Sequence, residues 1–323
     1  MKTLVVGAGV IGTAYAWKLS ESGNDVTLLV RKGKGQLIAQ DGIHICYRDE
    51  RKKEKKPTEI VFHPQITEEV LPQAGFELII VSVRAHQLED VLPLLAKYSG
   101  DAVILFFGNN WWGDEKIKKY LAAGQYLFGF SRLIGGWRTE NKIECVIFDH
   151  PQLATMLGEM NGEVTPRLEK LVGLFKDADL KPVISHDILG WLMVHYVEFL
   201  GIIGGMLNAG CVNAFVQDKA LIRRAILASR EGLNICQARG VKKSSIPINN
   251  QLVLLPVSLL TPLIRMQYQT LSIRQFFEEN IKFGRDELST QYFDVLAEGK
   301  RLGIDVPFLS AFEPDFATYH KGS

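Results

Sequence analysis

Cysteine is scarce in this sequence and widely spaced. The four cysteines, Cys46, Cys145, Cys211 and Cys236, show no C-x-x-C spacing in a chain of 323 residues. Zinc sites and disulfide frameworks need close or regular cysteine spacing, so we expect neither, and no metal site of another kind. Reduced thiols in a cytoplasmic protein fit this usage best.

An excess of either charge is also missing. Lysine and arginine total 37 against 36 for aspartate and glutamate, which leaves a net charge of +1. This balance gives no reason to expect a nucleic acid or an acidic membrane as partner. The densest charged run, residues 48–56, mixes both signs without aromatic residues and is typical of a solvated hairpin tip.

The sequence shows no uninterrupted apolar run that is long enough to span a membrane. Residues 252–264 come closest, but the run is short and contains Pro256 and Pro262. We therefore expect no membrane partner. We expect this run to be buried, either in a helical domain or in a subunit contact. The overall hydrophobic content of 47% indicates an ordinary globular core.

What the sequence does contain is a strand–turn–helix–strand unit at its start. Residues 2–6 are β-branched and aliphatic after Lys2, residues 13–20 read as a helix, and residues 26–30 read as a second buried strand. Between the first strand and the helix lies Gly7-Ala8-Gly9-Val10-Ile11-Gly12. In this context the G-x-G-x-x-G pattern predicts a dinucleotide-binding loop.

Each residue type in this loop has a physical role. Gly7 permits the tight turn, Gly9 lets a pyrophosphate approach the backbone, and Gly12 lets the helix close on the strand. Val10 and Ile11 open the helix, whose unpaired N–H groups and positive dipole end favour phosphate. We predict these five residues as cofactor-binding.

The end of the second strand indicates which dinucleotide is bound. An NAD site usually has an acidic residue there for the ribose 2′-hydroxyl. This chain instead has Val30 followed by Arg31, Lys32 and Lys34. A guanidinium can bind a 2′-phosphate through two hydrogen bonds, so Arg31 and Lys32 favour NADP. The alternative is that these cations belong to a solvated loop.

The first half of the chain continues as alternating strands and helices. In doubly wound sheets ligands bind at the carboxyl ends of strands, and Arg84, His86 and Asn109 follow two such strands. Arg84 would hold a substrate carboxylate or a cofactor phosphate, or form a surface ion pair. The expected strands are 42–47, 59–62, 76–83, 102–107, 126–130, 145–148 and 180–184, and the expected helices are 88–97 and 165–176.

The second half shows no strand pattern. Long helical periodicities cover residues 188–207, 218–239, 272–280 and 291–302, and Gly303 and Pro307 follow the last of them. We therefore predict an α/β Rossmann-type domain, residues 1–184, and an all-α domain for substrate binding or dimerisation, residues 185–323.

Several segments together resemble the ketopantoate reductase family, NADP-dependent reductases of 2-oxo acids. They include the glycine loop with Arg31, and Val81-Ser82-Val83-Arg84-Ala85-His86-Gln87, where the family usually has lysine at Arg84. The others are Phe107-Gly108-Asn109-Asn110, Ser185-His186-Asp187-Ile188-Leu189-Gly190, and Asp286-Glu287-Leu288 ahead of Leu302-Gly303-Ile304-Asp305-Val306-Pro307. The resemblance implies a 6-phosphogluconate-dehydrogenase-like helical domain, a cofactor contact for Asn109 and a substrate-ordering role for Glu287. Acidity at the start of a helix is the alternative explanation of Glu287.

The likeness fails at the family's catalytic positions. Counting from Asp187 places His195 at the family's lysine, and Phe199 and Ile203 at its two asparagines, while Gln275 replaces its serine. A histidine can still protonate a developing alkoxide near neutral pH. We therefore predict His195 and Glu287 as the catalytic candidates. A core histidine bonded to backbone remains the alternative for His195.

These inferences predict an NADPH-dependent reductase of a 2-oxo acid or a related small carbonyl compound. Two other functions remain open: an opine-dehydrogenase-like imine reductase with a histidine acid, and a non-catalytic NADP-binding sensor. Trp111 and Trp112 would cover the nicotinamide or pack between domains. We expect a small-molecule substrate, no nucleic-acid or membrane partner, and a homodimer as the candidate assembly.

Overall fold

The computed structural model describes residues 1–69, 74–139, 142–242 and 249–318, without the side chains of residues 86, 249, 250, 271 and 272. The chain forms two compact units, Met1–Leu189 and Gly190–Ser323. The sequence predicts this boundary between residues 184 and 185. Each unit is described by itself below.

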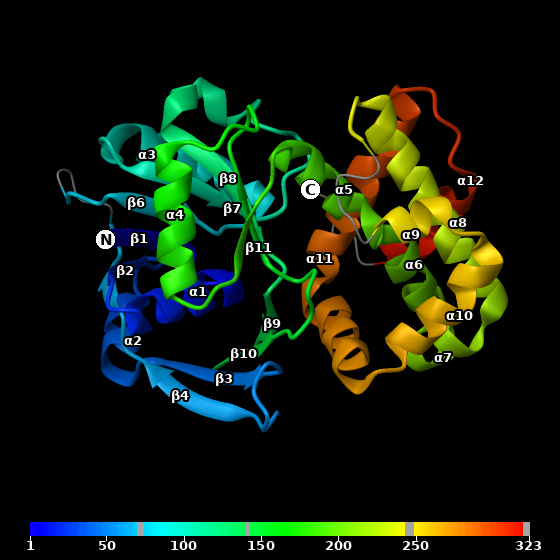
Figure 1. Cartoon of the computed structure of the whole chain (residues 1–323), viewed down its shortest axis with the longest axis horizontal. Coiled ribbons are helices and arrows are strands. Elements are labelled where there is room, and N and C mark those ends of the chain that lie inside the picture. The colour runs from blue at the N-terminus through cyan, green and yellow to red at the C-terminus, as the bar shows by residue number, and fades with distance from the viewer. Residues whose placement is uncertain (70–73, 140–141, 243–248, 319–323) are drawn as a thin grey trace. The chain divides into compact units, whose positions relative to one another are not determined.

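The first unit is built on an eight-stranded sheet (Figure 1). Its strand order is β12-β11-β8-β7-β6-β1-β2-β5, and all neighbours are parallel except β8 and β11. The six strands from β5 to β8 therefore have the doubly wound order of a Rossmann fold, as the sequence predicts. The strands are β1 (Lys2–Val6), β2 (Asp25–Leu29), β5 (Gln65–Thr67), β6 (Leu78–Val81), β7 (Val103–Phe107), β8 (Tyr126–Ser131), β11 (Thr155–Gly158) and β12 (Pro182–Ile184).

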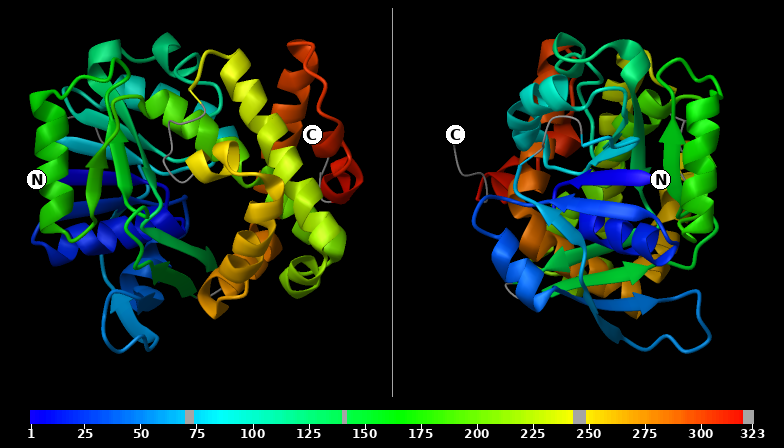
Figure 2. Two further views of the ribbon diagram at one scale, coloured as in Figure 1. Left: turned by 45° about the vertical axis from the view of Figure 1, so that its right-hand side comes forward. Right: turned by 90° about the vertical axis from the view of Figure 1, so that its left-hand side faces the viewer.

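A second, four-stranded sheet comes from two separate excursions of the chain. It has the order β4-β3-β10-β9, formed by β3 (Ile43–Asp49), β4 (Thr58–Phe62), β9 (Ile134–Arg138) and β10 (Lys142–Ile147). The expected hairpin of β3 and β4 is present, with Ile43 opposite Phe62. β3 also pairs in parallel with β10, which no local pattern predicts. Figure 2 shows the β3–β4 hairpin projecting in blue.

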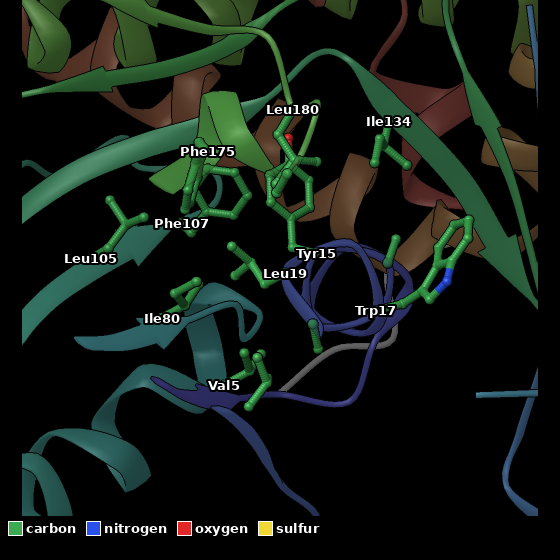
Figure 3. Close-up of a cluster of buried hydrophobic side chains, with 14 of the residues drawn as sticks. Val5, Tyr15, Trp17, Leu19, Ile80, Leu105, Phe107, Ile134, Phe175 and Leu180 are labelled. Carbon is green, nitrogen blue, oxygen red and sulfur yellow. The ribbon is translucent and has the colours of Figure 1, made fainter. Parts of the chain in front are cut away.

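Helix α1 (Val10–Glu21) is buried on more than one side and joins the two sheets. Tyr15 lies 4.7 Å from the Phe107 ring of the large sheet and 5.7 Å from Phe175, whereas Trp17 lies 4.8 Å from Tyr47 of the second sheet. Figure 3 shows Tyr15 and Trp17 leaving the helix in different directions. One hydrophobic cluster therefore includes residues of α1 and of both sheets.

The described part of the first unit contains three further α-helices. Helix α4 (Pro166–Asp177) contacts β11 and β12, and Thr165 caps it by accepting a hydrogen bond from the Leu168 N–H. Helix α3 (Leu88–Tyr98) lies where the sequence predicts it, whereas the short α2 (Gly35–Asp41) is not predicted. The 3-10 turns η1 (Ala85–Gln87), η2 (Ile117–Lys119) and η3 (Ala123–Gln125) also lie in this unit.

The described part of the second unit contains helices and no strand. Two predicted details are wrong. The predicted helix 188–207 is interrupted at Phe199, and the predicted helices 272–280 and 291–302 are one continuous helix. The helices are α5 (Ile188–Glu198), α6 (Leu200–Ala209), α7 (Val212–Gln217), α8 (Lys219–Ala238), α9 (Asn249–Leu254), α10 (Val257–Tyr268), α11 (Leu271–Arg301), α12 (Pro307–Ser310) and α13 (Glu313–Ala317).

From the sequence we expect residues 252–264 to come closest to a membrane-spanning apolar run, and we expect them to be buried. Both expectations need correction. Among the described residues, Ile188–Ala209 is apolar and long enough to span a membrane, but 78% of its most apolar window is buried in the protein. It is therefore a core segment. Its glycines at positions 201, 204 and 205 have no side chain, and neighbouring residues pack closely against them. Residues 252–264, in contrast, are only partly buried: Leu260 is 4% exposed, but Leu259 is 55% exposed.

Candidate functional site

The glycine loop lies between β1 and β6, where the strand order of the large sheet reverses direction. The Ser82 N–H, just past β6, donates to the Val6 carbonyl at 2.8 Å. Gly7 has a φ of +109°, and a Cβ there would lie 2.3 Å from the Ser82 carbonyl oxygen. Only glycine fits this position, for both reasons.

The other two glycines also match the requirements of a dinucleotide loop. A Cβ on Gly12 would lie 2.0 Å from the Gly7 carbonyl oxygen, so glycine is required for α1 to close on the loop. A Cβ on Gly9 would meet nothing within 4 Å. The loop is therefore crowded behind Gly7 and Gly12 but open at Gly9, and the N–H groups of Val10 and Ile11 have no intrahelical acceptor. The residues present fit a pyrophosphate.

Arg31 and Lys32 follow β2 at the neighbouring strand end, and both are exposed. The Lys32 ammonium lies 2.8 Å from the carboxylate of Glu69, which raises the pKa of Lys32. Arg31 forms no ion pair in the part of the chain that the structure describes. Of the two predicted 2′-phosphate cations, Arg31 is thus the one not engaged by a carboxylate.

Glu68 lies beside this pair and has a different role. Its carboxylate accepts the Gly35 N–H at 2.7 Å, and hydrogen bonds from the backbone of Gly35 and Gly33 hold its pKa below the ordinary value. The charge of Glu68 is thereby used to stabilise the turn after β2.

The next strand ends carry the other predicted residues of the first unit. Arg84 follows β6, is exposed, and forms no ion pair within the described ranges. The side chain of His86 lies outside the described residues. Asn109 follows β7 and is half-buried, while the neighbouring Asn110 donates to the Gly113 carbonyl at 2.9 Å. Of the two tryptophans, Trp111 is buried and Trp112 is exposed.

His195 in the second unit has a carboxylate partner on its own helix. Its Nδ1 lies 2.5 Å from Oε1 of Glu198, one turn later on α5. The Trp191 ring stacks on the imidazole at 5.2 Å, and the Phe199 ring meets it edge-on at 6.0 Å. The His195 side chain is 13% exposed and that of Glu198 is 2% exposed. The histidine is therefore held by a buried carboxylate and an aromatic face.

Glu287 lies on α11, which contacts α5 next to this histidine. The Tyr196 hydroxyl donates to Asp294 at 2.8 Å. Burial, and then the charges of Asp294 and Glu287, raise the pKa of Tyr196, so its hydroxyl stays protonated. Residue 196 therefore joins the helices that carry the two predicted catalytic groups.

Each unit thus collects its own share of the predicted residues. The loop glycines, Arg84 and Asn109 lie at carboxyl ends of adjacent strands in the first unit, and the helices of His195 and Glu287 contact each other in the second. The structure adds one candidate site residue that the sequence did not indicate. Nη1 of Arg138 donates to the Ala8 carbonyl of the glycine loop at 2.5 Å. No signal in the sequence connects residues 8 and 138.

The comparisons with known proteins agree with this architecture. The model of the ketopantoate reductase family PanE/ApbA matches residues 3–161. An uncharacterized oxidoreductase of Bacillus subtilis, YkpB, is 28% identical over 193 residues, and the match spans only 58% of either chain. The 2-dehydropantoate 2-reductase of Aquifex aeolicus is 25% identical over 232 residues, or 70% of each chain.

Solved structures share the fold over nearly the whole chain. A 2-dehydropantoate 2-reductase from Methylococcus capsulatus has a TM-score of 0.69 at 17% identity, covering 98% of this chain and 96% of that chain. D-mandelate dehydrogenase, solved with NADH and anilino(oxo)acetate, has a TM-score of 0.73 at 16% identity, covering 99% and 98%. The family model thus matches just under half of the chain, and the solved structures show the same fold over nearly its whole length, so the chain is similar to ketopantoate reductases in both comparisons.

Proposed function

We propose that this protein reduces a 2-oxo acid or a related small carbonyl compound with NADPH. The observation that carries the proposal is the glycine loop, open at Gly9 and followed at the next strand end by the exposed Arg31, which pairs with no carboxylate among the described residues. The loop fits the pyrophosphate that all nicotinamide dinucleotides share. Arg31 supplies the cation that a 2′-phosphate requires.

The cofactor would be held by the N–H groups that open α1, by Arg31, and by polar groups at the adjacent strand ends. When bound, it supplies hydride to the carbonyl carbon. Arg84 and Asn109 lie at the strand ends next to the loop, where the amide of Asn109 can orient the nicotinamide end and the guanidinium of Arg84 can bind a carboxylate or phosphate.

The proton would come from His195. A carboxylate oxygen accepts hydrogen bonds only, so Nδ1–H of His195 donates to Glu198 and Nε2 is the atom that exchanges a proton with the substrate oxygen. Glu198 fixes the ring orientation and stabilises the imidazolium form. Glu287 of α11, whose charge acts on Tyr196 of α5, would help to order the substrate.

Steady-state oxidation of NADPH with a panel of 2-oxo acids, each with and without added amines, tests this proposal. We expect turnover with at least one oxo acid in the absence of amine. Turnover only with an amine present would indicate imine reduction instead. Tight NADPH binding without turnover of any compound in the panel would favour a sensor.

A further inference from the structure

Arg138 places a guanidinium directly on the glycine loop. It is the last residue of β9 and lies opposite Ile143 of β10, in the second sheet. Its Nη1 donates to the carbonyl of Ala8, between Gly7 and Gly9, at 2.5 Å. The hydrogen bond therefore links the second sheet to the loop that opens the Rossmann unit.

The loop itself lacks a full positive charge. The first turn of α1 is formed by Val10, Ile11, Gly12 and Thr13, none of them ionisable, so its attraction for an anion comes from N–H groups and the helix dipole alone. Lys18 lies in the last turn of α1 and pairs with Glu21 at 2.7 Å. A pyrophosphate carries two negative charges that this arrangement leaves without a cation.

Arg138 has the means to supply that charge. A guanidinium has five N–H donors, and the Ala8 carbonyl accepts from one of its nitrogens. The side chain is exposed and forms no ion pair with a carboxylate in the ranges that the structure describes. The bond to Ala8 fixes the guanidinium beside Gly9, where the loop is open.

We propose that Arg138 is a cofactor-binding residue that contacts the pyrophosphate of the dinucleotide, which makes the second sheet part of the cofactor site. The inference rests on the proposed function. It separates two phosphate contacts: Arg31 binds the 2′-phosphate and distinguishes NADPH from NADH, whereas Arg138 binds the phosphates that both dinucleotides share.

Fluorescence titration of NADPH and NADH against Arg138→Ala tests the inference. Loss of one charge-assisted phosphate contact should weaken both dinucleotides by a similar factor, about tenfold to a hundredfold. Lys142→Ala is the matched control because it removes a cation from the adjacent strand without touching the loop, and it should leave both affinities unchanged. ADP-ribose should lose affinity for Arg138→Ala, whereas adenosine 2′-monophosphate, which lacks a pyrophosphate, should not.

Two further variants distinguish a phosphate contact of Arg138 from a purely structural role of its hydrogen bond to Ala8. Arg138→Lys keeps the charge and should retain part of the affinity, whereas Arg138→Gln keeps an N–H donor and should bind as weakly as Arg138→Ala. Recovery in Arg138→Gln, or unchanged affinity in Arg138→Ala, would overturn the inference while leaving the proposed function intact. Failure of the unmodified protein to bind either dinucleotide would overturn both.

Discussion

Arg31 and Lys32 are adjacent in sequence but differ in what surrounds them. Lys32 pairs with Glu69, whereas Arg31 has no carboxylate partner in the described residues. Arg31→Ala should therefore remove most of the preference for NADPH over NADH, about ten- to a hundredfold for one charge-assisted contact. Lys32→Ala, the control, should change the preference much less. Fluorescence titration with both dinucleotides measures this, and equal dissociation constants in the unmodified protein would refute it.

His195 is held by Glu198 and the Trp191 ring, an arrangement that suits an oriented proton donor. His195→Ala should lower kcat by about 10²–10⁴-fold, the usual contribution of a positioned acid. In the unmodified protein the rate should fall as the pH rises, since only the imidazolium supplies the proton. NADPH affinity should barely change, because the residues proposed to bind the phosphates belong to the other unit.

Steady-state rates across a pH series check the role of His195, with Glu198→Gln as companion. That variant should shift the pH at which the rate falls, since it removes the charge that stabilises the imidazolium. Unchanged turnover in His195→Ala would assign His195 a structural role, and Arg84 and Glu287 would become the next residues to test.

At the scale of elements, the apolar helix α6 depends on close packing against α8. A Cβ on Gly201 would lie 2.2 Å from the Ala225 carbonyl oxygen and 2.5 Å from the Ser229 amide nitrogen, both backbone atoms that cannot move aside. Gly201→Ala should therefore destabilise the second unit by about 1–3 kcal/mol, the usual cost of overpacking.

Gly284 of α11 provides the matched control in the same unit. Its nearest neighbour would be 3.5 Å from an added Cβ, so Gly284→Ala should stabilise the helix by up to about 1 kcal/mol. Chemical denaturation of both variants measures the difference. A Gly201→Ala variant as stable as Gly284→Ala would show that α6 and α8 pack differently.

Glu159 links β11 to α4 and makes the first unit sensitive to acid. Burial alone would raise the pKa of Glu159, but hydrogen bonds from Arg167 and Thr165 outweigh it, and the pKa lies below its ordinary value. A depressed pKa contributes stability above the unfolded-state pKa, and this is lost as the pH falls through the folded value. Glu159→Gln should flatten the acid-induced loss of stability, measured by denaturation between pH 3 and about pH 6.

At the scale of the whole molecule, the two compact units should unfold separately. Differential scanning calorimetry should resolve two transitions. NADPH should raise the temperature of the first unit's transition through binding to its native state. Gly201→Ala should lower only the second unit's transition, and Glu159→Gln only the first unit's. A single transition that both variants shift equally would contradict this expectation.

The parts of this fold that could be predicted are those determined by neighbouring residues in the sequence. The glycine loop, the central strands and the amphipathic helix α4 follow from short-range patterns. The strand β9, I-G-G-W-R, has weak strand propensity and forms because β10 and α1 lie beside it. The charged middle of α11 conceals the continuity of that helix, and the Arg138–Ala8 bond joins residues that no local rule connects.

The pairing of β3 with β10 has a consequence for biosynthesis. β3 leaves the ribosome long before β10 is made, so the nascent chain must carry its hairpin with one edge unpaired. Unpaired edges invite association between chains, and lysines discourage it. The exposed Lys52, Lys53, Lys55 and Lys56 at the hairpin tip are therefore well placed to keep neighbouring nascent chains apart until residue 147 has been added.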